Sequence, residues 1–187
     1  MILRGGSESL LSSTAIHAAL VRGLVAAGLP KADHAQIYLP AVVASLLVMG
    51  GVLFPMERRG RLREVFLGAI ALIAVVQLAL AASAATGPSL GVMAVLLFAF
   101  FCGSNILEAS QPSIASRSAP AQARGAALGF YNTLQSLGFF AGGALGGLLL
   151  RGTGATGLFI ACGVMTFAWL LVAWPMQSAE KQAAQAT

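Results

Sequence analysis

The chain is poor in charge: Lys, Arg, Asp and Glu together make up only 9% of its 187 residues. A soluble globular domain carries roughly 25% charged residues, so this composition argues against a soluble fold. The few charges are unequal in sign, with 11 basic against 6 acidic residues. Because the basic residues are spread over short loops and do not form one patch, they do not predict a nucleic-acid partner.

Cysteine and histidine are also scarce, with two of each. Cys102 and Cys162 fall inside apolar runs and form neither a CxxC motif nor a Cys/His cluster, so we expect two small core residues, no disulfide framework and no metal site. The sequence has no Ser/His/Asp set, no paired carboxylates at catalytic depth and no glycine loop between a strand and a helix. We therefore expect no cofactor and no enzymatic activity.

Long apolar runs are abundant instead, and 58% of the residues are hydrophobic. Each run has about 20 residues, which at 1.5 Å rise per residue matches a hydrocarbon core roughly 30 Å thick. Unbroken apolar runs also argue against a β-barrel, whose strands alternate. We predict an all-α, polytopic transmembrane helical bundle in the lipid bilayer, with five spans: Ile37–Met56, Phe66–Thr86, Ser89–Ala109, Ala126–Leu150 and Thr156–Trp174.

The first 29 residues fit this pattern poorly. Residues 10–29 are long enough to span the membrane, but they carry His17 and Arg22. An arginine at a helix centre costs about 2.5–3.5 kcal/mol on insertion scales, although one nearer the end can snorkel to the interface. We expect residues 1–29 to be a degenerate or partial first span, residues 30–176 the bundle and residues 177–187 a tail. Whether residues 10–29 insert as a sixth span stays open.

The loops between the runs predict the orientation of the chain. Six arginines lie in two of these loops: Arg58, Arg59, Arg61, Arg63, Arg117 and Arg124. Because positively charged loops stay on the cytoplasmic side, we expect these loops and the C-terminal tail in the cytoplasm. Trp169 and Trp174 then fall near the inner interface, as residues of an aromatic belt.

Glycine is frequent, with 22 residues, and it gathers in the fourth run. At a spacing of four, these glycines form rows along a helix: Gly125 and Gly129; Gly138, Gly142 and Gly146; Gly143 and Gly147. Small residues so spaced let helices approach closely in lipid. The simpler interpretation is tight packing inside the bundle. The sharper one is a sliding or rocking contact between the helices of a transporter.

Polar residues inside the runs are a further signal. Glu108 is the one carboxylate within the five runs and lies three residues from Asn105, so the two share a helix face. Such groups are costly in lipid unless they face a partner or a water-filled cavity. Glu108 is therefore a candidate proton carrier. Alternatively, it lies at the cytoplasmic interface, where it meets headgroup water or pairs with Arg117 or Arg124.

Three stretches carry a resemblance to a known family. Asn105–Pro120 (NILEASQPSIASRSAP) and Arg124–Gly147 (RGAALGFYNTLQSLGFFAGGALGG) are similar to helices 10 and 11 of a major facilitator superfamily transporter. The branch that they resemble is the bacterial YajR-like drug:proton antiporters. Met56–Arg61 (MERRGR), with Gly60 among its arginines, resembles the basic loop between helices 8 and 9 of that family. The resemblance covers residues 28–176.

The resemblance implies half of a larger fold. Such transporters resemble two six-helix halves with a substrate site near the midplane between them, and this chain matches the second half. The implied function is proton-coupled efflux of a small molecule across the cell inner membrane by rocking. An N-terminal half or a second copy of the chain would be the partner. The residues expected to line the substrate cavity are Asn105, Tyr131, Asn132 and Gln135.

Two alternatives stay open at this point. The chain is either a truncated membrane protein that inserts but transports nothing, or a small interaction protein that associates through its glycine-rich helix. Both alternatives have the predicted fold, but neither includes transport.

Overall fold

The computed structural model describes residues 20–21, 23–25, 27–87, 89–117 and 119–175. Its elements are two 3-10 turns and four long helices: η1 (Lys31–Asp33), α2 (His34–Arg58), α3 (Leu62–Thr86), α4 (Leu90–Arg117), η2 (Ala121–Ala123) and α5 (Arg124–Ala173). Within the described residues, four helices are long and apolar enough to cross a membrane. The predicted all-α transmembrane bundle is confirmed.

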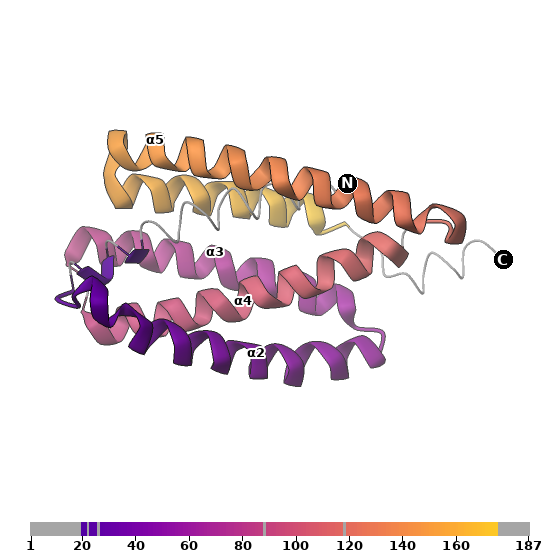
Figure 1. Ribbon diagram of the computed structural model, residues 1–187, viewed down its shortest axis with the longest axis horizontal. Helices are drawn as coiled ribbons and strands as arrows, with labels where there is room; N and C mark the ends of the chain where they lie inside the picture. Colours follow the sequence, from indigo (N-terminus) through magenta and orange to yellow (C-terminus); the bar gives the residue numbers. More distant parts are fainter. Residues whose placement is uncertain (1–19, 22, 26, 88, 118, 176–187) are drawn as a thin grey trace.

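Helix α5 contains two of the predicted spans. Gly154 has φ 70° and ψ −172°, a conformation with positive φ that glycine adopts readily because it lacks a Cβ. The chain reverses there, and the two arms of α5 lie side by side in opposite directions (Figure 1). The arm over residues 124–153 corresponds to the fourth predicted span and the arm over residues 155–173 to the fifth. Five predicted spans thus occupy four helices.

The helices and the two arms of α5 run along a common axis, and the chain reverses its direction at alternate ends of the bundle. In Figure 1, α2 lies at one edge of the bundle and the first arm of α5 at the opposite edge. The turns from α2 to α3 and from α4 to α5 share one end, called the basic end below, and the turn at Gly154 lies at the other. At the basic end Arg63 donates a hydrogen bond of 2.6 Å to the carbonyl of Trp174, which ties the start of α3 to the end of α5.

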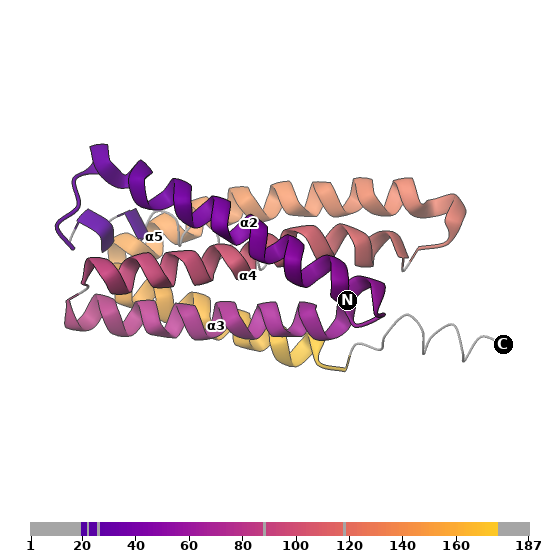
Figure 2. The ribbon, with the colours of Figure 1, turned by 90° about the horizontal axis from the view of Figure 1, so that it is seen from below.

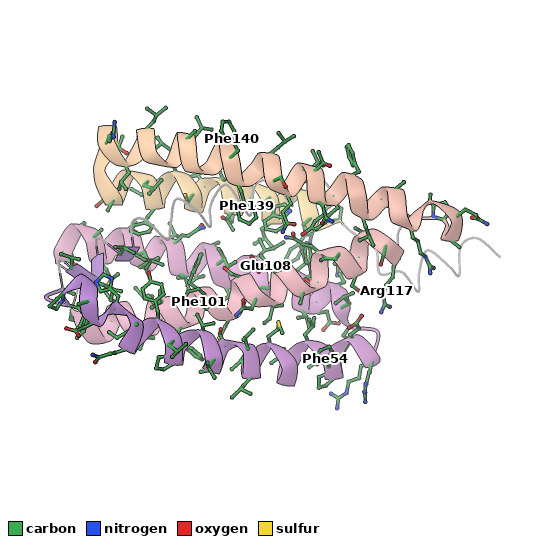
Figure 3. The ribbon with its side chains drawn as sticks, viewed as in Figure 1. Phe54, Phe101, Glu108, Arg117, Phe139 and Phe140 are labelled. Atoms are coloured by element: carbon green, nitrogen blue, oxygen red, sulfur yellow. The ribbon has the colours of Figure 1, made fainter. Side chains whose placement is uncertain are left out.

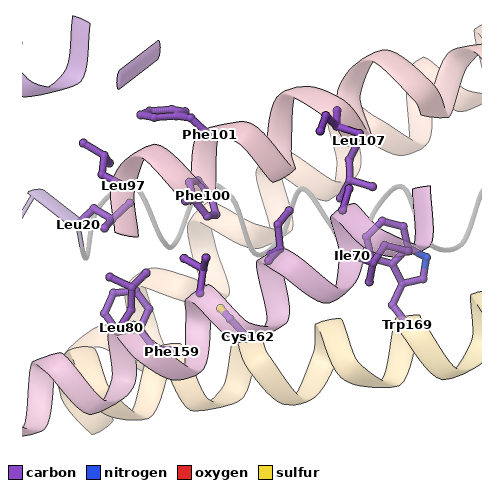
Figure 4. Close-up of a cluster of buried hydrophobic side chains, with 14 of the residues drawn as sticks. Leu20, Ile70, Leu80, Leu97, Phe100, Phe101, Leu107, Phe159, Cys162 and Trp169 are labelled. Atoms are coloured by element: carbon purple, nitrogen blue, oxygen red, sulfur yellow. The ribbon is translucent and has the colours of Figure 1, made fainter. Parts of the chain in front are cut away.

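The core is centred on α3, which packs against α4 on one side and α5 on the other. Figure 4 shows the cluster of buried side chains that these helices share; it includes Leu20, Ile70, Leu80, Leu97, Phe100, Leu107 and Phe159. Cys102 and Cys162 are both buried and form no disulfide, as expected of small core residues.

One expectation about the tryptophans is wrong. Trp169 does not lie in an interfacial belt, because its side chain is only 5% exposed and packs edge-to-face on Phe66, with ring centroids 5.7 Å apart. It points from the second arm of α5 into the interface with α3, where a large flat ring fills space between helices. Trp174 is 63% exposed at the end of the same arm, in keeping with an interfacial position.

The start of the chain is described only in part. The question of whether residues 10–29 span the membrane lies largely outside the described residues, as does the predicted tail over residues 177–187. Of the described part, Leu20 and Leu24 are fully buried and belong to the core cluster. These two leucines therefore pack with the bundle ahead of α2.

The glycine rows have different surroundings. Gly138, Gly142 and Gly146 are buried, so this row packs inside the bundle as the simpler interpretation predicts. Gly143 and Gly147 are exposed. A Cβ added at Gly147 would meet no atom within 4 Å, which places the row of Gly143 and Gly147 on the surface.

Replacing one glycine of the buried row and one of the exposed row tests this difference in burial. Gly142→Leu should lower the free energy of unfolding by about 1–3 kcal/mol, because a larger side chain overpacks a buried contact. Gly147→Leu, the matched control, should change it by less than about 0.5 kcal/mol, as exposed substitutions do. Unfolding in mixed micelles, followed by circular dichroism, measures both. Equal losses in the two variants would contradict the assignment of buried and exposed rows.

Candidate functional site

Polar side chains of α2 and α4 meet inside the bundle. The Asn105 amide donates to the hydroxyl oxygen of Ser45 at 2.7 Å, and the Ser45 hydroxyl donates to the carbonyl of Val42 at 2.7 Å. Ser45 is fully buried and Asn105 is half-buried. Hydrogen bonds of this kind hold helices together in lipid. Asn105 therefore helps to fix α2 on α4, and Ser45, its partner, is a residue that the sequence analysis missed.

A second polar contact joins α4 to the first arm of α5. The Tyr131 hydroxyl donates to Oε1 of Gln111 at 2.8 Å, and both side chains are 2% exposed. Among the described residues, the amide nitrogen of Gln111 has no hydrogen-bond partner. Glu108, one turn earlier on α4, lies close enough to act electrostatically on Tyr131. The site thus combines a buried tyrosine, an amide with unused donors and a nearby carboxylate.

The other predicted site residues lie at the edge of this group. Asn132 is exposed and Gln135 is half-buried on the first arm of α5, and Glu108 is exposed on α4. No hydrogen bond joins Asn132 or Gln135 to the contacts of Asn105 or Tyr131 among the bonds of the described residues. Nor do three His, Cys, Asp or Glu side chains gather as metal ligands anywhere in the described ranges.

The structure gives Arg117 a partner other than Glu108, with which the sequence analysis paired it as one alternative. Helix α4 continues eight residues beyond the predicted span and ends at Arg117, so Glu108 lies about 13 Å back along the helix. Figure 3 shows Glu108 and Arg117 well separated on the ribbon. Arg117 pairs instead with Glu57 of α2, with 2.5 Å between guanidinium nitrogen and Oε1. Hydropathy alone ended the span too early, because a helix can run on past the apolar region.

Glu57, Ser113 and Arg117 form a small polar cluster at the basic end. The Ser113 hydroxyl donates to the same Glu57 oxygen at 3.1 Å, and Nε of Arg117 donates to the Ser113 hydroxyl oxygen at 3.2 Å. The cluster joins the last turn of α2 to the last turn of α4. The sequence analysis missed Glu57 and Ser113. One signal was available in the sequence. Glu57 and Arg117, an acid and a base 60 residues apart, follow two predicted spans that run in the same direction.

The arginines of the predicted basic loop differ in their surroundings. Gly60 turns the chain from α2 to α3 with φ 72°. Arg61 pairs with Glu64 at 2.5 Å. The exposed side chains of Arg58 and Arg59 form no ion pair or hydrogen bond with the described residues.

Comparison with known proteins decides the family. The profile of the Major Facilitator Superfamily matches residues 12–186, most of the chain. The chain belongs to this superfamily. It is 36% identical over 172 residues to the inner membrane transport protein YajR of Escherichia coli, an alignment that covers 90% of this chain and 36% of that protein. The chain therefore spans little more than a third of this relative's length.

Shorter stretches match gamma-glutamyl phosphate reductases. The Allorhizobium ampelinum enzyme is 52% identical over 65 residues, which are 32% of this chain and 15% of the enzyme. The Brucella anthropi enzyme is 73% identical over 37 residues, which are 20% of this chain and 8% of the enzyme. Matches to 15% and 8% of an enzyme do not show its fold or its activity in this chain, because function must be argued from a site. The superfamily assignment is unaffected.

A double-mutant cycle tests the contact between α2 and α4. Ser45→Ala and Asn105→Ala should be coupled by about 0.6 kcal/mol and by no more than about 1.7 kcal/mol, the range for interhelical hydrogen bonds in membranes. Unfolding of the two single variants and the double variant in mixed micelles gives the coupling. Thr133→Val is the control partner for Asn105→Ala, because the exposed Thr133 hydroxyl bonds to Gly129 of its own helix. Additive losses of Ser45 and Asn105 would contradict the contact.

The pair at the basic end should respond to salt. Arg117 is 55% and Glu57 24% exposed, so we expect a coupling of about 0.2–1 kcal/mol at low ionic strength that fades as salt is added. A cycle of Glu57→Gln and Arg117→Gln, repeated at low and high salt, measures it. Arg124→Gln in place of Arg117→Gln is the control. A coupling that persists unchanged at high salt would show that the pair is not exposed to solvent.

Proposed function

We propose that this chain is the C-terminal half of a proton-driven exporter of the inner membrane, which expels a small molecule by alternately opening a cavity to the two sides. The observation that carries the proposal is the buried Tyr131–Gln111 pair, in a chain whose family transports across membranes. Polar groups are costly to place inside a membrane protein, and those that are found there mark substrate and ion pathways.

Helix α4 supplies most of the proposed cavity wall. It presents Asn105 to α2 and Gln111 to the first arm of α5, with Glu108 between them in sequence. In a transporter of two related halves the substrate site lies near the midplane at their interface, and one half contributes one wall. Asn132 and Gln135 extend the proposed wall along α5. The unused amide donors of Gln111 suit a substrate that carries a hydrogen-bond acceptor.

Glu108 is the proposed proton carrier. Its carboxylate is exposed on α4 and acts electrostatically on Tyr131, so gain or loss of a proton changes the charge at the proposed cavity. A charged carboxylate resists removal from water much more strongly than a protonated one does. Protonation therefore favours the closed cavity, and exchange of a proton for the substrate couples the proton gradient to export.

The partner in this proposal is an N-terminal half, on a separate chain or elsewhere in a longer one, or a second copy of the chain. The chain spans 36% of the length of the transport protein it matches. Large apolar side chains on both outer helices are strongly exposed, for example Leu47 on α2 at 74% and Phe140 on the first arm of α5 at 78%. In the two-half architecture these helices meet the other half.

One observation favours a second candidate function. The exposed row of Gly143 and Gly147 is open to close approach by another helix, which suits a small interaction protein or a truncated, non-transporting one. The DNA upstream of the codon for Met1 separates the possibilities. A six-span half encoded there supports an exporter with an N-terminal half, and its absence leaves a second copy of the chain as the partner or favours the second candidate.

Substitution of Glu108 tests the proton step. Proteoliposomes holding the chain with its N-terminal half, or the chain alone if it is active, should accumulate ethidium against its gradient when a pH difference is imposed. Glu108→Gln should reduce this uphill transport to the level of protein-free vesicles and leave downhill exchange. Glu64→Gln, the same change at an acid paired with Arg61, is the control. Undiminished uphill transport by Glu108→Gln would rule out the proposed role.

A further inference from the structure

Two prolines interrupt neighbouring helices near the basic end of the bundle. Pro55 lies inside α2 and Pro112 lies inside α4, each close to the end of its helix. Glu57 and Ser113 follow these prolines closely in sequence, and the two side chains are bonded to each other. The prolines therefore lie at nearly the same level of the bundle. Figure 3 shows Phe54, the residue before Pro55, on the part of α2 near the basic end.

Each proline weakens its helix at one place. A proline nitrogen carries no hydrogen, so it donates no bond to the carbonyl one turn earlier, which is that of Gly51 in α2 and that of Glu108 in α4. Sharp bends in helices occur at prolines for this reason. In α2 a second glycine, Gly50, lies beside Gly51, and a groove of about 430 Å³ opens next to Pro55. Helix α2 thus has a weakened place with open space beside it.

Beyond the prolines, the ends of the two helices are bonded to each other. The Ser113 hydroxyl donates to the Glu57 carboxylate at 3.1 Å, and Arg117 pairs with the same carboxylate. On the other side of the prolines, the Asn105 amide donates to Ser45 at 2.7 Å. The weakened places therefore lie between two levels at which α2 and α4 are joined. A bend at one proline would carry the end of the other helix with it.

We propose that Pro55 and Pro112 form a paired hinge, at which the ends of α2 and α4, joined through Glu57, swing together as one flap at the basic end. The remainder of both helices keeps its place in the bundle. A hinge needs only a few residues that absorb the change in backbone angles between rigid segments. The hinge itself does not depend on transport. Its consequence for transport rests on the proposed function. The α2 helix meets the other half there, and Glu108 lies one turn before Pro112, so the flap changes access to Glu108 from the basic end.

Restoring a backbone donor tests the hinge. Pro55→Ala removes an exposed ring, which costs little packing, and gives α2 the missing hydrogen bond. Amide hydrogen exchange should slow in the last turn of α2 and, because the ends move together, by the same factor in the last turn of α4. The factor expected for one net hydrogen bond is roughly 2- to 10-fold. Exchange in the full-length chain, held in nanodiscs at low ionic strength and followed by mass spectrometry, measures both ends. Pro40→Ala, at an exposed proline near the start of α2, is the control and should change neither end. Slowing confined to α2, or absent from both helices, would overturn the proposal.

Further variants test the second proline and the bonds that join the ends. Pro112→Ala should give the reciprocal result, slower exchange at the end of α2 as well as of α4. The double variant Ser113→Ala/Arg117→Gln removes both partners of Glu57, so in that background Pro55→Ala should slow exchange in α2 alone. Ends that stay coupled in the double variant would show that other contacts join them, and the proposal would fail. Unchanged exchange in the middle of α3 checks that each variant keeps its fold. Because the readout is exchange in the chain alone, failure of the hinge is distinguishable from failure of the proposed proton step.

Discussion

The arrangement of the bundle depends on the polar contacts that α4 makes with its neighbours on both sides. Apolar helix faces gain little from meeting one another in lipid, so close packing and hydrogen bonds decide which helices associate. Helix α4 bonds to α2 through Asn105 and to α5 through Gln111. In the bilayer the backbone N–H and C=O groups form their hydrogen bonds within each helix, so side chains such as these determine which helices pair.

Chain length and hydropathy predicted the spans well, because a hydrophobic run of membrane length has few alternatives to a helix. Gly154 then folds the two arms of α5 against each other at the place between the last two predicted spans. The end of α4 was predicted less well. Ser110 and Gln111 lower the hydropathy there, yet both are buried, because the helix continues and neighbouring helices cover it. Hydropathy reports affinity for lipid and does not report contact with a neighbouring helix.

Residue type alone singled out two residues that join helices, but it did not give their partners. Tyr131 and Asn105 stand out in the sequence as polar residues in apolar runs, and both make interhelical hydrogen bonds. Their partners, Ser45 and Gln111, gave little signal, because a single serine is common in transmembrane helices and Gln111 lay beyond the predicted span. Which polar residue meets which depends on helix rotation, and a sequence without a structure does not fix that rotation.

Helix α2 lies against α4 (Figures 1 and 2), and side chains hold the two helices together at three levels. The Tyr38 and Phe101 rings meet edge-to-face at 5.9 Å, Ser45 bonds to Asn105, and Glu57 pairs with Arg117. From the first level to the last, α2 covers about 28 Å. A slide of one helical turn between α2 and α4 would break all three contacts together. We therefore expect the two helices to move as one unit, so that the rocking motion proposed above would occur at a surface other than the α2–α4 interface.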